Sequence, residues 1–407
     1  MSTVADVAPV DLSDSRSYVD GVPHAYLTYL RHHDPVHWQD EPGGPGFWAI
    51  TRYEDCVTVN RDYERFSSAA QGTMPFEMEP DEIAQQGLMM LNMDPPLHTR
   101  YRRLVNKGFT PRMVRDLEES IHRATDAIID EVIEKGEADF VTQISAELPL
   151  QVIAELLGVP SDDRHRMFEW SNRMVGSEDP EYAVSEDQAA SAQMEMFAYA
   201  NQLAEARRSA PKDDIISVLL ASEIDGDALT ELEFNLFFML LAVAGNETTR
   251  NAIAHGMNAF LENPDQYRRL VEQPTELINS ATEEILRWAS PVMYFKRYVT
   301  KPTKVGGQAL SPGEKVSMWY VSANRDEDVF SDPFAFDISR DPNPHIAFGG
   351  GGPHHCLGSN LARMEIRVLF EELARRVPEL EALEAPQPLR SNFIGGIKHL
   401  PVRLKTA

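Results

Sequence analysis

The amino-acid sequence predicts a mainly α-helical protein with small β-sheets at its periphery. Apolar residues recur at helical spacing over most of the stretch from about residue 98 to residue 290. The segments that resemble strands are short and lie mostly near the two ends of the chain. The 407 residues contain no internal repeat and no long flexible linker, so we expect one domain over residues 1–407.

The composition excludes several classes of protein. The formal net charge is −26, whereas a nucleic-acid binder needs a basic face. Two cysteines cannot form a disulfide framework, and they fit a reducing compartment. The first 30 residues lack a secretion signal, and the longest apolar run, residues 236–245, is shorter than the ~20 residues of a membrane span. We therefore expect a cytoplasmic protein that does not enter a membrane.

Four short segments have the composition of β-strands. In chain order they are residues 46–51, 296–299, 314–320 and 399–404. Cys56, soon after the first of them, lies in an ordinary amphipathic segment and is interpreted as a structural residue.

One predicted helix is unusually long. Thr230 and Glu233 form the signature of a capping box, and Asn263-Pro264 ends the apolar pattern, so the helix is expected over residues 231–262. At ~1.5 Å per residue it would be roughly 48 Å long and would cross the middle of the molecule.

The centre of this helix is locally weak and polar. Gly245 lowers helix propensity, and Thr248 can donate to the carbonyl of Ala244 four residues earlier, which bends helices. Glu247 would be costly if buried without a partner. The alternative is that Glu247 faces water. A distortable polar spot inside a buried helix points to a functional role.

Residues 345–363 (HIAFGGGGPHHCLGSNLAR) form a glycine-rich loop that ends in Cys356. Glycines without side chains allow a large flat ligand to approach the backbone. We expect a helix from Leu357 onward, whose N-terminus would favour a Cys356 thiolate, a soft metal ligand. Cys356 could instead be a buried structural thiol, or His354, His355 and Cys356 could begin a zinc site, although a good fourth ligand is lacking.

Three motifs together resemble those of a soluble bacterial cytochrome P450. They are the cysteine loop, residues 244–249 (AGNETT) and a Glu-x-x-Arg pair. The pair also occurs at Glu205–Arg208, Glu247–Arg250 and Glu372–Arg375, and only Glu284–Arg287, about 70 residues before the cysteine, has the right context. The resemblance covers essentially the whole chain and includes Asn324-Arg325-Asp326.

The resemblance implies a cytochrome P450 fold with the long helix over heme b. Cys356 would be the axial thiolate ligand of the iron, and Glu284 and Arg287 a structural pair behind the heme. Other residues at cofactor-binding positions of the family are His98, Arg102, Arg297 and His354 for the propionates, Ala244 and Gly245 beside dioxygen, and Phe348, Gly350 and Gly358 in the loop. Phe348 lies eight positions before Cys356, one more than in the commonest loop of the family, which leaves open which of glycines 349–352 contact the heme.

The same resemblance assigns Glu247 and Thr248 as the acid–alcohol pair that relays protons to bound dioxygen. Met74, Met78, Met89, Met90 and Met93 lie in a segment that covers the substrate pocket in the family, although methionines can also simply fill a core. Further pocket positions are Met239, Val243, Val292, Phe295, Phe393 and Ile394. No residue among them suits a charged ligand.

These features indicate a monooxygenase that inserts one oxygen atom from O2 into a C–H bond of a bulky apolar substrate. The segments NETTRNAIAHGMNAF and GIKHLPV are most similar to enzymes acting on steroids, methyl-branched lipids and terpenoids. Two alternatives are a heme-thiolate peroxygenase or isomerase, which does not need the Glu247–Thr248 relay, and a heme-binding sensor.

Electrons would come from separate proteins, a ferredoxin and its reductase, and we expect the chain to be a monomer. Residues 98–115 carry six Lys/Arg and no Asp/Glu despite the overall charge. By resemblance this segment lies behind the heme, near Arg363 and Arg367. An acidic ferredoxin could be steered to the residues left for docking, Arg100, Arg103, Lys107, Arg112 and Arg115.

Overall fold

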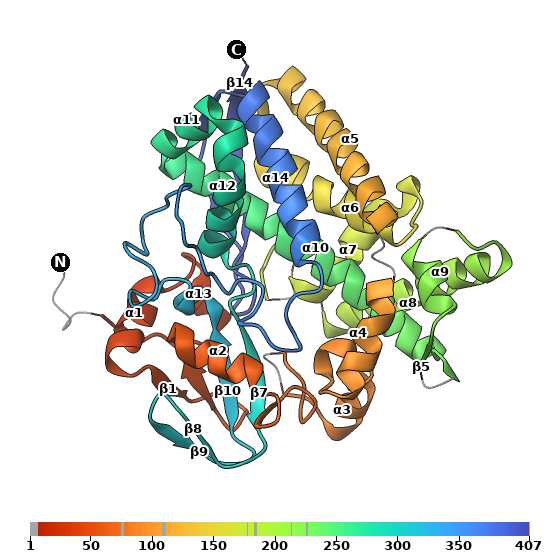
Figure 1. Ribbon diagram of the computed structural model, residues 1–407, viewed down its shortest axis with the longest axis vertical. Helices are drawn as coiled ribbons and strands as arrows, with labels where there is room; N and C mark the ends of the chain where they lie inside the picture. The colour runs from red at the N-terminus through yellow and green to blue at the C-terminus, as the bar shows by residue number, and fades with distance from the viewer. Residues whose placement is uncertain are drawn as a thin grey trace.

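The structure is a computed structural model. It describes residues 7–74, 77–107, 111–176, 178–182, 185–212, 214–224 and 227–406, and the side chains of Lys107, Arg112 and Arg115 lie outside this description. Helices form most of the molecule, and the largest sheet lies at one side (Figure 1). The predicted fold class, mainly α-helical with small peripheral sheets, is confirmed. No helix within the described ranges is long and apolar enough to cross a bilayer.

The largest sheet joins the N-terminal part of the chain to residues 294–319. Its strands are β1 (Val36–Gln39), β2 (Phe47–Ile50), β10 (Lys315–Trp319), β7 (Tyr294–Val299) and β3 (Phe66–Ser67), in that spatial order. Val316 of β10 is paired with Trp48 on one side and with Arg297 on the other. This register places Arg297 on an interior strand.

Three of the four predicted strands correspond to β2, β7 and β10. The fourth, expected over 399–404, is divided into β13 (Ile397–His399) and β14 (Pro401–Lys405). β13 pairs with β12 (Gln387–Pro388), whereas β14 pairs with β11 (Glu379–Ala382) and β4 (Glu137–Asp139). The division falls at Leu400, whose N–H donates to the Asp139 side chain and whose carbonyl accepts from the Phe140 N–H.

The long helix is α10 (Glu231–Glu262), with the predicted bounds. The Thr230 hydroxyl accepts from the Glu233 N–H while the Glu233 carboxylate accepts from the Thr230 N–H. α10 runs through the middle of the molecule and contacts α6 (Glu147–Leu156), α8 (Glu186–Ser209), α12 (Pro274–Ala289) and α14 (Ser359–Arg376) (Figure 1). The remaining helices are α1 (His24–His33), α2 (Tyr53–Arg61), α3 (Pro80–Gln86), α4 (Leu97–Lys107), α5 (Pro111–Lys135), α7 (Arg164–Val175), α9 (Ile215–Leu220), α11 (Pro264–Glu272) and α13 (Tyr320–Ala323), and the remaining strands are β5 (Glu223–Ile224), β6 (Asp227–Ala228), β8 (Thr303–Val305) and β9 (Gln308–Leu310).

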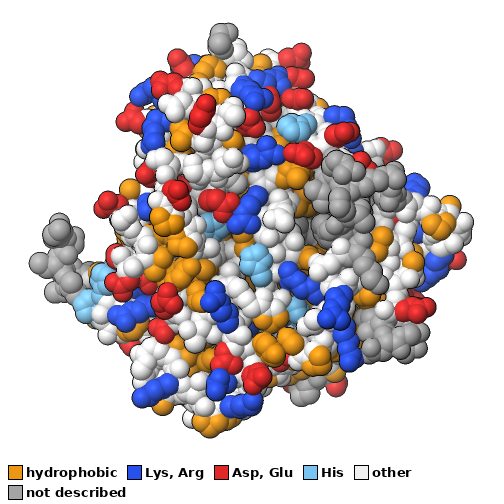
Figure 2. Space-filling view, viewed as in Figure 1, with side chains coloured by type: hydrophobic (Ala, Val, Ile, Leu, Met, Phe, Trp, Pro, Cys, Tyr) orange, Lys and Arg blue, Asp and Glu red, His pale blue; other side chains and the backbone are white. Residues whose placement is uncertain are grey.

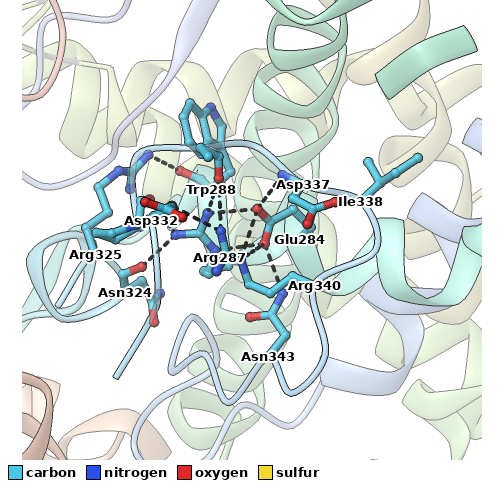
Figure 3. A network of polar contacts seen from close by, with 12 residues as sticks. Glu284, Arg287, Trp288, Asn324, Arg325, Asp332, Asp337, Ile338, Arg340 and Asn343 are labelled. Atoms are coloured by element: carbon cyan, nitrogen blue, oxygen red, sulfur yellow. Dashed lines mark hydrogen bonds and ion pairs between the residues drawn. The ribbon is translucent and has the colours of Figure 1, made fainter. Parts of the chain in front are cut away.

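A buried ion pair connects α12 to the segment that leads to the cysteine loop (Figure 3). Arg287 donates to both carboxylate oxygens of Glu284 at 2.8 Å, and both side chains are 0% exposed. Arg287 also donates to the carbonyls of Asn324 and Pro333, and Glu284 accepts from Arg340 at 3.1 Å. Every polar atom of this pair is therefore directed to a defined partner.

Replacing Arg287 by Met should destabilise the protein by about 3–5 kcal/mol, because Glu284 would remain buried with one of its charge partners removed. Denaturant unfolding of the heme-loaded protein measures this loss. The matched control is Arg268→Met on α11, where the Arg268 side chain is 64% exposed, so its ion pair with Asp265 should contribute at most ~1 kcal/mol. Equal losses in the two variants would contradict a structural role for the Glu284–Arg287 pair.

Candidate active site

A cavity separates the middle of α10 from the cysteine loop. Thirteen residues predicted from the sequence to bind cofactor, oxygen or substrate line it. They are Met90, His98, Arg102, Ala244, Gly245, Thr248, Val292, Phe295, Arg297, Phe348, His354, Cys356 and Gly358. Residues far apart in the sequence are thus brought to one site.

The cysteine loop presents Cys356 to this cavity. The backbone N–H of Cys356 donates to the Phe348 carbonyl at 2.9 Å, which closes the loop on itself. α14 begins at Ser359 with Gly358 as its N-cap, two residues later than predicted. The Cys356 sulfur therefore lies just before a helix N-terminus.

The protein surroundings of Cys356 do not favour a thiolate by themselves. Burial raises the pKa of the Cys356 thiol, and the Gly358 N–H, Arg102 and Arg363 only partly oppose this. The Gly358 N–H lowers the pKa of the Cys356 thiol, which is the direction that the sequence predicts for a helix N-terminus, but burial outweighs it. A metal ion that binds the sulfur displaces the proton, so metal binding and deprotonation are coupled.

The four consecutive glycines have different surroundings. Gly349 lines the cavity. Gly350, predicted to contact the cofactor, instead lies against α2, where a β-carbon on it would be 2.9 Å from the Val57 Cα. A β-carbon on Gly352 would be 2.5 Å from the Asn60 carbonyl oxygen, and its φ of +78° also favours glycine. At these two positions glycine allows the loop to pack closely on α2.

Basic side chains from three segments line one part of the cavity. Arg297 of β7 is only 3% exposed, donates to the Lys296 carbonyl and has no carboxylate partner among the described residues. His98 of α4 is buried and its Nδ1 has no partner. Arg102, also on α4, donates to the Pro353 carbonyl, and the Nε2 atom of His354 lies 3.1 Å from the Ser68 hydroxyl. Buried cations without counter-charges are suited to an anionic ligand.

The histidines and arginines of this group differ in charge. Burial and the nearby Arg102 lower the pKa of His98 to about 4, and burial with Arg297 lowers the pKa of His354 to about 2. Both imidazoles are therefore neutral at pH 7. The positive charge on this wall comes from Arg102 and Arg297, and the orphaned His98 nitrogen can hydrogen-bond to the same ligand. The propionates of a heme would satisfy these groups, so the residues fit that cofactor.

The opposite wall is the middle of α10. The Thr248 hydroxyl donates to the Ala244 carbonyl at 2.8 Å, as the sequence predicts, and the helix continues without a break. A β-carbon on Gly245 would lie 2.8 Å from Ile153 Cδ1, so glycine at this position lets α6 approach α10.

Glu247 does not line the cavity beside Thr248. It is 2% exposed and forms an ion pair with Arg250, Oε2 to Nη2, at 2.5 Å. Arg250 in turn donates to the Asn172 side chain of α7 at 3.1 Å, while Glu247 Oε1 has no partner. Burial raises the pKa of Glu247 and Arg250 opposes the rise. The alternative that Glu247 faces water is wrong, and the Glu247–Arg250 motif that sequence context discounted is a real ion pair.

Of the predicted substrate residues, Met90, Val292 and Phe295 line the cavity. Phe393 packs on Phe295 with ring centroids 5.5 Å apart, and Ile394 is bridged to Val292 by backbone pairing. Neither is part of the wall, and Met89, Met239 and Val243 lie in or against the hydrophobic core. Met74, Met78 and Met93 are also absent from the wall. The α10 residues that line the cavity, in part not predicted, are Leu240, Leu241, Ala244, Gly245, Thr248, Thr249 and Ala252.

These lining residues occupy one helix face at i, i+3 and i, i+4 spacing. Counting back four residues from Ala244 and Gly245 would have found Leu240 and Leu241. The segment 239–243 is uniformly apolar, so hydrophobicity alone does not identify the face.

The proposed docking residues can be placed only in part. Arg100 and Arg103 are exposed on α4, where Figure 2 shows a group of basic side chains, and Arg102 of the same helix faces inward. The side chains of Lys107, Arg112 and Arg115 lie outside the described part of the chain. Arg363 is paired with Glu283 at 2.6 Å and Arg367 with Glu118 at 2.9 Å.

A cysteine loop facing a helix with an alcohol, with unpaired arginines at the cavity wall, defines a heme-thiolate site. Comparison with known proteins agrees: the sequence profile named Cytochrome P450 matches residues 20–377. The chain belongs to the cytochrome P450 family. It is a cytochrome P450 monooxygenase, and its cofactor is heme b.

Several members of the family are similar over nearly their whole length. The steroid C26-monooxygenase of Mycolicibacterium smegmatis is 43% identical over 401 residues, which cover 96% of this chain and 93% of that protein. The methyl-branched lipid omega-hydroxylase of Mycobacterium tuberculosis is 42% identical over 392 residues, covering 94% and 91%. The crystal structure of a Mycobacterium marinum cytochrome P450 in complex with pseudoionone has a TM-score of 0.90 at 39% identity, covering 98% of this chain and 100% of that one.

Replacing Arg297 by Met should weaken heme binding by about 10- to 100-fold, because a charge-assisted hydrogen bond contributes ~1.5–3 kcal/mol. The rate of heme transfer from the holoprotein to excess apomyoglobin measures this change. Arg103→Met, on the exposed side of α4, serves as the control and should lose heme no faster than the unmodified protein. Unchanged heme retention in Arg297→Met would remove Arg297 from the cofactor site.

Proposed function

We propose that this monooxygenase hydroxylates a bulky apolar substrate, a steroid or a methyl-branched lipid, with electrons from a separate ferredoxin. The substrate class is inferred from the chemistry of the cavity wall. The part formed by α10, α6 and residues 90–91 and 291–295 carries no charged side chain among the described residues. An anionic or cationic headgroup would find no partner there, whereas a hydrocarbon skeleton would be desolvated on all sides.

The named relatives support the same substrate class. Two of the similar proteins are named for a steroid and for a methyl-branched lipid, and a third was crystallised with pseudoionone. Terpenoids belong to the same class of bulky apolar substrates. The substrate-facing residues of this proposal are Met90, Leu91, Leu240, Leu241, Val292 and Phe295.

The site residues have distinct roles in this proposal. Cys356 would hold the heme iron as its thiolate ligand, and the bound heme would supply the activation of dioxygen. Arg102 and Arg297 pair with the propionates, and His98 and His354 hydrogen-bond beside them. The Thr248 hydroxyl is the group of the relay that faces the cavity. Glu247 is the acid that carries the proton. It must first release its ion pair with Arg250 before it can pass a proton toward the cavity.

The electron donor would approach α4. Arg100 and Arg103 are exposed on the helix that also carries Arg102 into the site, which keeps the path from a docked protein to the heme short. An acidic ferredoxin is attracted to this local positive charge although the whole chain is strongly acidic. We further propose that the chain acts as a cytoplasmic monomer with one domain over residues 1–407.

The holoprotein should bind steroids and methyl-branched fatty acids with a change in heme spin state, read from the absorption spectrum. Turnover with a ferredoxin, its reductase and ¹⁸O₂ should then give an alcohol that carries one labelled oxygen, measured by mass spectrometry. Charged, compact molecules such as benzoate serve as the control and should give no product. Product oxygen that comes from water, or no product from any apolar substrate, would contradict the proposal.

Replacing Thr248 by Ala should uncouple turnover: NADPH consumption continues while product falls and hydrogen peroxide rises. The loss of one positioned proton-transfer group typically costs about 10²-fold or more in the chemical step. The ratio of product to NADPH consumed is the measurement. Thr58→Ala on α2 removes the same kind of bond, from Thr58 to the Glu54 carbonyl at 2.8 Å, away from the cavity, and should leave this ratio unchanged. Unaltered coupling in Thr248→Ala would exclude Thr248 from the relay.

A further inference from the structure

A second cavity lies beside the C-terminal half of α10. It is formed by the N-terminal segment around residues 18–24, by α10 and the end of α12, by Arg325, and by residues 386–397. Its walls are mixed: Trp288, Met293 and Leu389 are apolar, while His24, His255 and Arg325 are polar. None of these residues has a role in the heme site.

Arg325 is the unusual group in this cavity. It is 3% exposed, and its Nη2 donates to the Trp288 carbonyl at 2.9 Å. The guanidinium carbon lies 4.8 Å from the centre of the Trp288 ring. Nε and Nη1 have no hydrogen-bond partner, and no carboxylate of the described residues forms an ion pair with Arg325. A buried guanidinium therefore has two nitrogens with unsatisfied donors at a cavity wall.

The nearby carboxylate of Glu284 is already paired with other arginines and does not pair with Arg325. Figure 3 shows Glu284 on the far side of Arg287, where Arg287 and Arg340 both bind its carboxylate. Burial, with the neighbouring Arg287 and Arg31, lowers the pKa of Arg325 to about 9, which still leaves it charged at neutral pH. Burial of an unpaired cation is costly unless a ligand or water compensates it.

The other polar groups of the cavity complete a site for one negative charge. The Nδ1 atom of His24 is buried without a partner, and burial lowers the pKa values of His24 and of His255, the latter to about 4. These imidazoles are neutral at pH 7, so Arg325 supplies the charge. Asp20 and Glu262 also line the cavity and are exposed. They would repel a doubly charged anion such as phosphate or sulfate more strongly than a single carboxylate.

We propose that the second cavity binds a small monocarboxylate. Its carboxylate accepts from Arg325, whose planar guanidinium matches that geometry, and the Nδ1 atom of His24 supplies a further polar contact. The apolar part of the ligand contacts Trp288, Met293 and Leu389. The site is separate from the heme cavity and does not depend on the identity of the substrate.

The probe is 4-bromobenzoate, with its neutral isostere 4-bromobenzamide as the control ligand. In crystals of the heme-loaded protein, the bromine should give an anomalous peak in the second cavity, with the carboxylate against Arg325. Isothermal titration should show saturable binding of 4-bromobenzoate that is at least tenfold weaker for the amide. Arg325→Met should abolish that binding, whereas Arg268→Met, an exposed arginine on α11, should retain it.

Several outcomes would overturn the proposal. They are ordered water on Nε and Nη1 of Arg325 with no bromine peak, binding at crystal concentration only, and equal affinity for acid and amide. If Arg325→Met does not fold, the proposal is tested on the unmodified protein, by its crystal structure with the ligand and by its relative affinities for the acid and the amide. Displacement of the ligand into the heme cavity, seen as a change in heme spin state without a peak beside Arg325, would also count against the site.

Discussion

The buried Glu284–Arg287 pair is the interaction on which the geometry of the site depends. It joins α12 to the Asn324 and Pro333 carbonyls, and the Asn324 side chain then accepts from the Ile346 N–H at 2.7 Å. The Ile346 carbonyl in turn accepts from the Gly349 N–H, in the loop that leads to Cys356. A buried pair of this kind adds little net stability but is costly to break, so it specifies one position for the loop. The cysteine is placed by these bonds together with the bond from its own N–H to the Phe348 carbonyl.

The buried charged side chains fall into two groups, those that are paired within the protein and those that have no counter-charge in the part of the chain that the structure describes. Glu284 with Arg287, and Glu247 with Arg250, are paired within the protein. Arg297 and Arg325 are equally buried but have no carboxylate partner among the described residues. Since a buried cation without a counter-charge is unfavourable, such residues mark places where a ligand completes the structure. Arg297 lies in the cofactor cavity and Arg325 in the second cavity.

Local signals predicted well those features that depend on neighbouring residues in the sequence. The capping box at Thr230 and the break at Asn263-Pro264 define α10, and the bond from Thr248 to Ala244 is likewise local. Features that depend on tertiary packing were harder to predict from the sequence. The rotation of α10, which brings Leu240 rather than Met239 to the cavity, depends on how α6 and α12 pack around it. The raised pKa of the Cys356 thiol and the burial of Glu247 depend on enclosure by distant segments.

The proposed function depends on Cys356 binding the heme iron as a thiolate. The most direct measurement is the absorption spectrum of the reduced, heme-loaded protein under carbon monoxide. Thiolate ligation by Cys356 should give the strongly red-shifted Soret band, and this band should be lost when Cys356 is replaced by His. A band of the histidine-ligated type in the intact, unmodified protein would exclude Cys356 as the ligand.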